Sequence, residues 1–131
     1  MIKVVLDTNV LVSSLLTSGP PAAIVDLITD SRIIPHYNDL ILQEYWDVLT
    51  RKKFSFSSLQ VTRLINDILR SGIVVDYKQS SNKTMIDEDD QIFYDAAFEA
   101  KAYLITGNTR HFPPDSLIVS PAQFLSILFK G

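Results

Sequence analysis

The chain begins with a short apolar segment, after which the spacing of the apolar residues changes. Residues 2–6 are apolar except for Lys3, and a run this short is typical of a strand buried on both faces of a parallel sheet. Beyond Asp7-Thr8-Asn9, apolar residues return at helical spacing, at Val10, Leu11, Leu15 and Leu16. This pattern predicts a buried strand that leads directly into a helix.

The same alternation continues to the end of the chain. Short apolar runs predict further strands at residues 32–37, 73–77, 103–106 and 117–119. Helical spacing, capping residues and prolines predict helices over residues 20–28, 39–52, 59–71, 87–101 and 121–129. Strands that alternate with helices predict a three-layer α/β/α fold with a central parallel sheet.

Two segments depart from this pattern. Pro35 lies inside the strand predicted at residues 32–37, and because proline cannot donate to a ladder, it predicts an edge strand or an irregular strand end. Residues 78–84 are polar, have no periodicity and predict a loop. We find no repeat and no linker, so residues 1–131 are predicted to form a single domain.

Composition narrows the functional classes. Of the 131 residues 47% are hydrophobic and 21% charged, and the absence of cysteine excludes disulfides and cysteine zinc sites. No signal peptide or membrane-spanning run is evident, so a cytoplasmic protein is expected. A net charge of -3 argues against tight nonspecific binding to duplex nucleic acid. It leaves open a nucleic-acid enzyme whose acids are neutralised by a metal ion.

Asp7 is the first candidate for chemistry. It follows the predicted first strand directly, and open α/β sheets bind their ligands at the carboxyl ends of their strands. The alternative is that Asp7 only caps the next helix, a role that aspartate favours. Thr8 or Asn9 can supply that cap instead, so both interpretations stay open.

Glu44 is the second candidate. On the predicted helix it borders the apolar stripe instead of facing solvent, and a lone carboxylate beside a buried face needs a partner or a metal ion. A salt bridge, or simple exposure at the edge of the stripe, is the commoner explanation, because acids at that edge are normal on amphipathic helices.

Four consecutive acids, Asp87 to Asp90, form the third candidate. Acids in a first helical turn favour the helix dipole, but four exceed what a cap needs. Asp90 is predicted on the inward face of its helix. Asp7, Glu44 and Asp90 can therefore meet at one edge of a parallel sheet, where carboxylate oxygens suit Mg²⁺ or Mn²⁺.

The sequence resembles the PIN-domain family, and more narrowly the VapC-like toxins of toxin–antitoxin systems. The residues that carry the resemblance agree in order and spacing along nearly the whole chain. They are residues 5–11, Glu44 with residues 48–54, residues 87–94 and residues 104–108.

The resemblance implies a Mg²⁺- or Mn²⁺-dependent endoribonuclease whose metal-binding and catalytic acids are Asp7, Glu44 and Asp90. The family often has a fourth acid after Thr-Gly, where this chain has Asn108. This departure predicts tight binding of at most one ion. Asp95 is a candidate to compensate, but its angle on the helix is predicted to point it somewhat away.

Other residues are expected around these acids. Asn9 is expected to hydrogen-bond a carboxylate or the substrate. Thr106, Asn108 and Arg110 are likewise expected either to orient a metal-binding residue or to contact phosphate. For His111, a phosphate contact and a structural role both remain possible. Arg51, Lys52 and Lys53 either contact the RNA backbone or only complement a helix end.

The resemblance also implies partners: an RNA substrate, an antitoxin that covers the acidic cleft, and a second copy of the chain. Phe124, Leu125, Leu128 and Phe129 are candidates for the dimer contact, although core packing explains them as well.

Two other classes compete with a nuclease. A phosphotransferase of the haloacid dehalogenase type requires a second acid two residues after the first, where this chain has Asn9. A binding module that keeps the fold and docks RNA or protein without cleaving it is compatible with Asn108 and the acidic charge.

Overall fold

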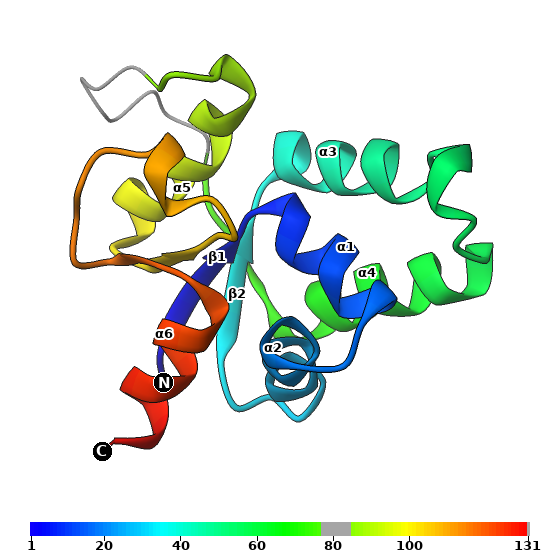
Figure 1. The fold of residues 1–131 in the computed structure, drawn as a ribbon, viewed down its shortest axis with the longest axis horizontal. Helices are drawn as coiled ribbons and strands as arrows, with labels where there is room; N and C mark the ends of the chain where they lie inside the picture. Colours follow the sequence, from blue (N-terminus) through cyan, green and yellow to red (C-terminus); the bar gives the residue numbers. More distant parts are fainter. Residues whose placement is uncertain (77–84, 131) are drawn as a thin grey trace.

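The computed structural model describes residues 1–76 and 85–130. A five-stranded sheet, with all neighbouring strands parallel, has the order β3-β2-β1-β4-β5. The strand that opens the chain therefore lies in the middle of the sheet (Figure 1). The strands are β1 (Lys3–Leu6), β2 (Ile34–Tyr37), β3 (Ile73–Val74), β4 (Tyr103–Ile105) and β5 (Ile118–Val119).

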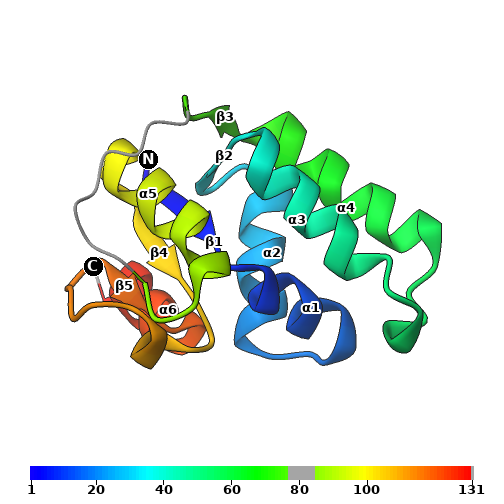
Figure 2. The same ribbon diagram turned by 90° about the horizontal axis from the view of Figure 1, so that it is seen from above.

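Helices cover both faces of this sheet. Helix α5 lies on one side and α1 to α4 on the other, and α6 packs against α2 (Figures 1 and 2). The predicted three-layer α/β/α fold is confirmed. The α-helices are α1 (Thr8–Leu16), α2 (Pro20–Thr29), α3 (Asp39–Leu49), α4 (Ser58–Ser71), α5 (Gln91–Ala100) and α6 (Pro121–Phe129).

Capping side chains fix where several helices begin. The Asn38 side chain accepts a hydrogen bond from the Ile41 N–H at 2.9 Å and starts α3 directly after β2. Ser57 and Ser120 each form a capping box with the glutamine three residues later, at the starts of α4 and α6. These local signals explain why the predicted element order holds.

Of the two possibilities predicted from Pro35, the edge strand is wrong, because β2 lies between β3 and β1. The Ile34 N–H donates to the Ile2 carbonyl beside β1, so the nitrogen of Pro35 faces the β3 side. Pairing with β3 begins only at His36, opposite Ile73. The missing N–H therefore falls just before the β2–β3 ladder and leaves it intact.

Two predicted boundaries also shift. The helix expected to reach residue 52 ends at Leu49, and a separate 3₁₀ turn, η1 (Lys52–Phe54), follows it. The four acids do not open α5 directly, because a 3₁₀ turn, η2 (Glu88–Asp90), comes first. The loop predicted at residues 78–84 lies outside the described residues.

The core centres on β1. Val4, Val5 and Leu6 are buried between the two helix layers, as expected for a strand covered on both faces. The buried Tyr45 hydroxyl donates to the Leu6 carbonyl at 2.6 Å and ties α3 to the end of this strand. No single described helix is long and apolar enough to span a membrane; α1 and α2 pass that test only as a pair bent by 101°.

Candidate functional site

Asp7 lies at the carboxyl end of the central strand, with its backbone N–H donating to the Ile105 carbonyl at 2.9 Å. It occupies the N-cap position of α1, but its side chain makes no capping hydrogen bond. Instead, its Oδ2 accepts hydrogen bonds from Thr106 Oγ1 at 2.8 Å and from Asn9 Nδ2 at 3.2 Å. The carboxylate is therefore held by side chains, and helix capping does not explain its orientation.

Thr106 and Asn9 also tie Asp7 to the loop after β4. Thr106 Oγ1 accepts from the Asn108 N–H at 3.0 Å, and Asn9 Oδ1 accepts from the Gly107 N–H at 3.0 Å. Thr106 is fully buried, so of the two roles expected of it the phosphate contact is not available in this structure. Its hydroxyl positions Asp7 instead.

Asp90 lies at the end of η2, with 14% of its side chain exposed. Its Oδ2 is buried without a hydrogen-bond partner and lies 3.6 Å from His111 Nδ1. Burial, followed by the charges of Asp7 and Asp87, raises the pKa of Asp90 to about 6. Burial likewise raises the pKa of Asp7, which the hydrogen bond from Thr106 partly offsets. The carboxylates of Asp7 and Asp90 thus repel each other at one edge of the sheet.

Glu44 is half-buried on α3 and forms no salt bridge within 4 Å with any described residue. Burial is the main cause of its raised pKa, and Asp89 is the next cause. Asp89 was not singled out from the sequence. Four adjacent acids do not show which one faces α3 until the path of the 3₁₀ turn is known.

Carboxylates of this kind are suited to bind a divalent cation, which requires ligand side chains that lie close together. Among the described residues, no three Asp, Glu or His side chains are close enough together to form a metal site. The predicted set of Asp7, Glu44 and Asp90 is therefore not assembled as a three-ligand cluster. Mg²⁺, however, needs only one or two carboxylates with water and phosphate. Asp7 and Asp90 fit that need, since Asp90 Oδ2 accepts no hydrogen bond and the two charges repel.

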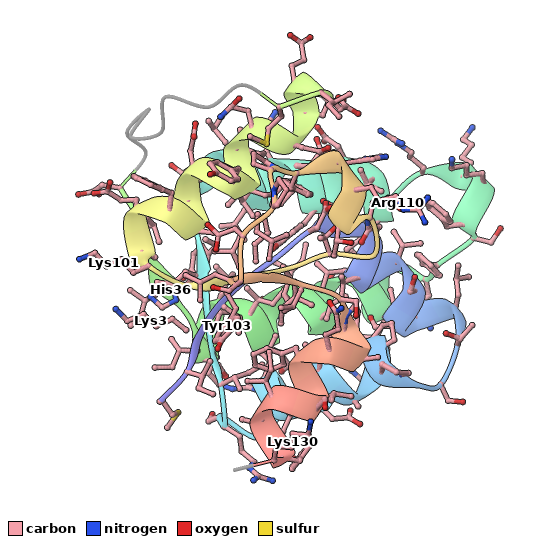
Figure 3. All side chains as sticks on the ribbon, turned by 60° about the vertical axis from the view of Figure 1, so that its left-hand side comes forward. Lys3, His36, Lys101, Tyr103, Arg110 and Lys130 are labelled. Carbon is pink, nitrogen blue, oxygen red and sulfur yellow. The ribbon has the colours of Figure 1, made fainter. Side chains whose placement is uncertain are left out.

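The remaining predicted residues lie at different depths. Asp95 is buried and accepts a hydrogen bond from the Gln91 side chain at 2.9 Å, within its own helix. Asn108 and Arg110 are exposed beyond β4, and Arg110 lies on η3 (Thr109–His111) (Figure 3). The three basic residues Arg51, Lys52 and Lys53 are also exposed, at and after the end of α3. Arg51 is near enough to Glu44 for its charge to lower the pKa of that carboxyl, although burial outweighs it.

Replacing Thr106 with Val should test whether its hydroxyl positions Asp7. The change keeps the shape but removes a donor to a buried carboxylate and an acceptor for the Asn108 N–H. We expect a loss of about 2 kcal/mol in the free energy of unfolding, measured with urea at neutral pH. Thr106→Ser keeps the hydroxyl and should lose clearly less; equal losses in the two variants would show that packing, and not the hydrogen bond, matters here.

Comparison with known proteins identifies relatives of this chain. Residues 3–110 match the sequence model of the PIN domain. The uncharacterized protein MJ1680 of Methanocaldococcus jannaschii is 32% identical over 111 residues, which cover 82% of this chain and 71% of that protein. Among solved structures, VapBC2 from Rickettsia felis, bound to a DNA fragment from its promoter, contains a chain with a similar fold. The TM-score is 0.55 at 15% identity, over 83% of this chain and 90% of that one.

Proposed function

The chain belongs to the PIN-domain family, and from this membership we propose that it is a metal-dependent endoribonuclease that hydrolyses RNA phosphodiester bonds. PIN-domain proteins are generally nucleases that use divalent metal ions. The observation that carries the proposal is the pair of carboxylates at the end of the central strand. Asp7 is oriented by two side chains, and Asp90 Oδ2 is buried without a hydrogen bond where the charge of Asp7 helps to raise its pKa.

In this proposal Asp7 and Asp90 hold Mg²⁺ or Mn²⁺, and Glu44 joins them or orients a water molecule. A bound ion lowers the pKa of a water molecule and stabilises charge that develops on phosphate. Thr106 and Asn9 keep the Asp7 carboxylate in one orientation, so that it need not reorganise when substrate arrives.

Basic residues flank these acids and suit a charged RNA backbone. Arg110 and His111 lie on the Asp90 side, since His111 contacts Asp90. Arg51, Lys52 and Lys53 lie beyond Glu44, where α3 ends. We propose that these two groups contact phosphates on either side of the cleaved bond, which offsets the repulsion between RNA and a chain of net charge -3.

We further propose that the protein is the cytoplasmic toxin of a toxin–antitoxin pair. The support is the likeness in fold to a chain of VapBC2. The antitoxin would cover the acidic edge, with an Arg or Lys side chain among the carboxylates. Of the α6 residues considered for a dimer, Phe124 is buried in the core, whereas Phe129 is 64% exposed and available for a second copy.

A non-catalytic RNA- or protein-binding module is the second candidate. Two observations favour it: Asn108 stands where the family often has an acid, and the described residues contain no three-ligand group. No observation supports the phosphotransferase alternative. That class needs a second acid at position 9, where this chain has Asn9, and the Asn9 side chain is hydrogen-bonded to Asp7 and Gly107.

Metal titration followed by RNA cleavage distinguishes a nuclease from a binding module. We expect Mn²⁺ or Mg²⁺ to raise the melting temperature by several degrees, because an ion that binds only the folded state stabilises it. The same ions should support cleavage of an unstructured fluorogenic RNA, and EDTA should abolish both effects. A protein that binds this RNA but neither responds to metal nor cleaves would be the binding module.

A further inference from the structure

A small cleft with a mixed polar and apolar lining borders the Asn9 side chain, and Asp7 is not among the residues that line it. Its volume is about 230 Å³. Helix α1 forms one wall, the loop after β4 another, and two prolines complete it. The main lining residues are Asn9, Ser13, Pro21, Gly107, Asn108 and Pro121. We propose that this cleft receives one unpaired nucleobase of the RNA, next to the phosphate that is cleaved. This inference rests on the proposed function.

The lining favours a base over a phosphate group. No charged side chain lines the cleft, although the Asp7 carboxylate is hydrogen-bonded to its wall at Asn9 and Arg110 lies two residues beyond Asn108. A phosphate in a neutral cleft would lose its hydration without gaining a counter-charge, whereas a neutral base loses much less. The volume is below the roughly 300–1,000 Å³ of sites for drug-sized ligands and suits a single ring system.

Two side chains in the cleft are available to read the edge of a base. Asn108 occupies the N-cap position of η3, but its side chain makes no capping hydrogen bond. The Ser13 hydroxyl and the Asn108 amide form no hydrogen bond with any residue in the described part of the chain. An amide that both donates and accepts can pair with a base edge, provided that the base is not already paired within a duplex.

Asn9 links this cleft to the acids. Its amide lies between the Asp7 carboxylate and the Gly107 N–H, with hydrogen bonds on both sides. A Cβ atom at Gly107 would approach Asn9 Oδ1 to 3.3 Å, so this contact is tight. A base seated against this wall would hold its own sugar and phosphate close to Asp7, which couples recognition of one nucleotide to the position of the cleaved bond.

Binding of single nucleotides to the metal-free protein tests the cleft directly. Isotope-labelled protein would be titrated with each of the four nucleoside 5′-monophosphates and, separately, with inorganic phosphate. We expect at least one nucleotide to shift the amide resonances of Ser13, Gly107 and Asn108, and inorganic phosphate to leave them unchanged. Asn108→Ala should weaken that binding at least about fivefold, the lower end of what a base contact contributes. The matched control is Asn66→Ala, on the exposed surface of α4.

Cleavage of an unstructured RNA by the metal-loaded protein gives a second measurement. Asn108→Ala should reduce the preference for the favoured base at the cleaved position, and Asn66→Ala should not. Cleavage with no nucleotide effect in the cleft would overturn this inference and leave the nuclease proposal standing. Nucleotide binding in the cleft without RNA cleavage would support this inference and contradict the nuclease proposal. Equal shifts with inorganic phosphate would assign the cleft to phosphate and overturn the base assignment.

Discussion

Asp7→Asn is expected to lower the rate of RNA cleavage at least about a thousandfold, because stabilisation of the charge on phosphate by a bound ion contributes several kcal/mol. The fold should survive, since asparagine keeps an oxygen that can accept the Thr106 hydrogen bond. Removing this charge also ends its repulsion of Asp90. The metal-free variant should therefore melt at a higher temperature than the metal-free parent, while its response to Mn²⁺ largely disappears.

The opposite signs of these two effects make the prediction specific. Cleavage would be followed with a fluorogenic RNA, and melting by circular dichroism with EDTA and with Mn²⁺. Asp26→Asn removes one exposed acid from α2 and serves as the charge-matched control; it should alter neither cleavage nor the metal response. If Asp7→Asn kept its cleavage rate within about tenfold of the parent, the proposed site would be refuted.

The fold could be predicted because its signals are local in the sequence. The apolar run of residues 2–6 ends at an acid, and the helical spacing that follows leaves few alternatives to a strand that leads into a helix. Asn38 and Ser57 cap helices where the pattern predicts them. Pro35 left an edge strand and an irregular strand end both open, because the sequence does not show which side of the strand its nitrogen faces.

The site could be predicted only in part, because its details depend on contacts between distant residues. A carboxylate after a central strand is visible in the sequence, as is a surplus of acids at residues 87–90. Thr106 was a candidate, but its hydrogen bond to Asp7, 99 positions away, becomes evident only once β4 pairs with β1. Likewise, the effect of the Asp89 charge on Glu44 depends on the 3₁₀ turn η2, whereas helical spacing already predicted Asp90 on the inward face.

The metal-free protein is expected to lose stability as the pH rises from about 4 to about 6, and Asp90 is one cause. The pKa of Asp90 is raised from 3.8 to about 6, so in this range the folded state binds a proton that the unfolded state releases. This loss of stability is complete above pH 6, and it is absent below the pKa of 3.8 that Asp90 has in the unfolded state. A rise of about two in the pKa of Asp90 corresponds to roughly 3 kcal/mol in the free energy of unfolding. Because the carboxylate is partly exposed to solvent, screening reduces this to about 1 kcal/mol.

Asp90→Asn should therefore be more stable than the parent by about 1 kcal/mol at neutral pH without metal, and equal to it near pH 4. Urea unfolding with EDTA at a series of pH values measures this difference. Asp7, whose pKa is also raised, remains in the variant, so some loss of stability with rising pH should persist. With Mn²⁺ the order should reverse, because the parent gains binding energy that the variant lacks. A variant that is equally or less stable at neutral pH without metal would show that the Asp90 carboxylate carries no strain that a cation could relieve.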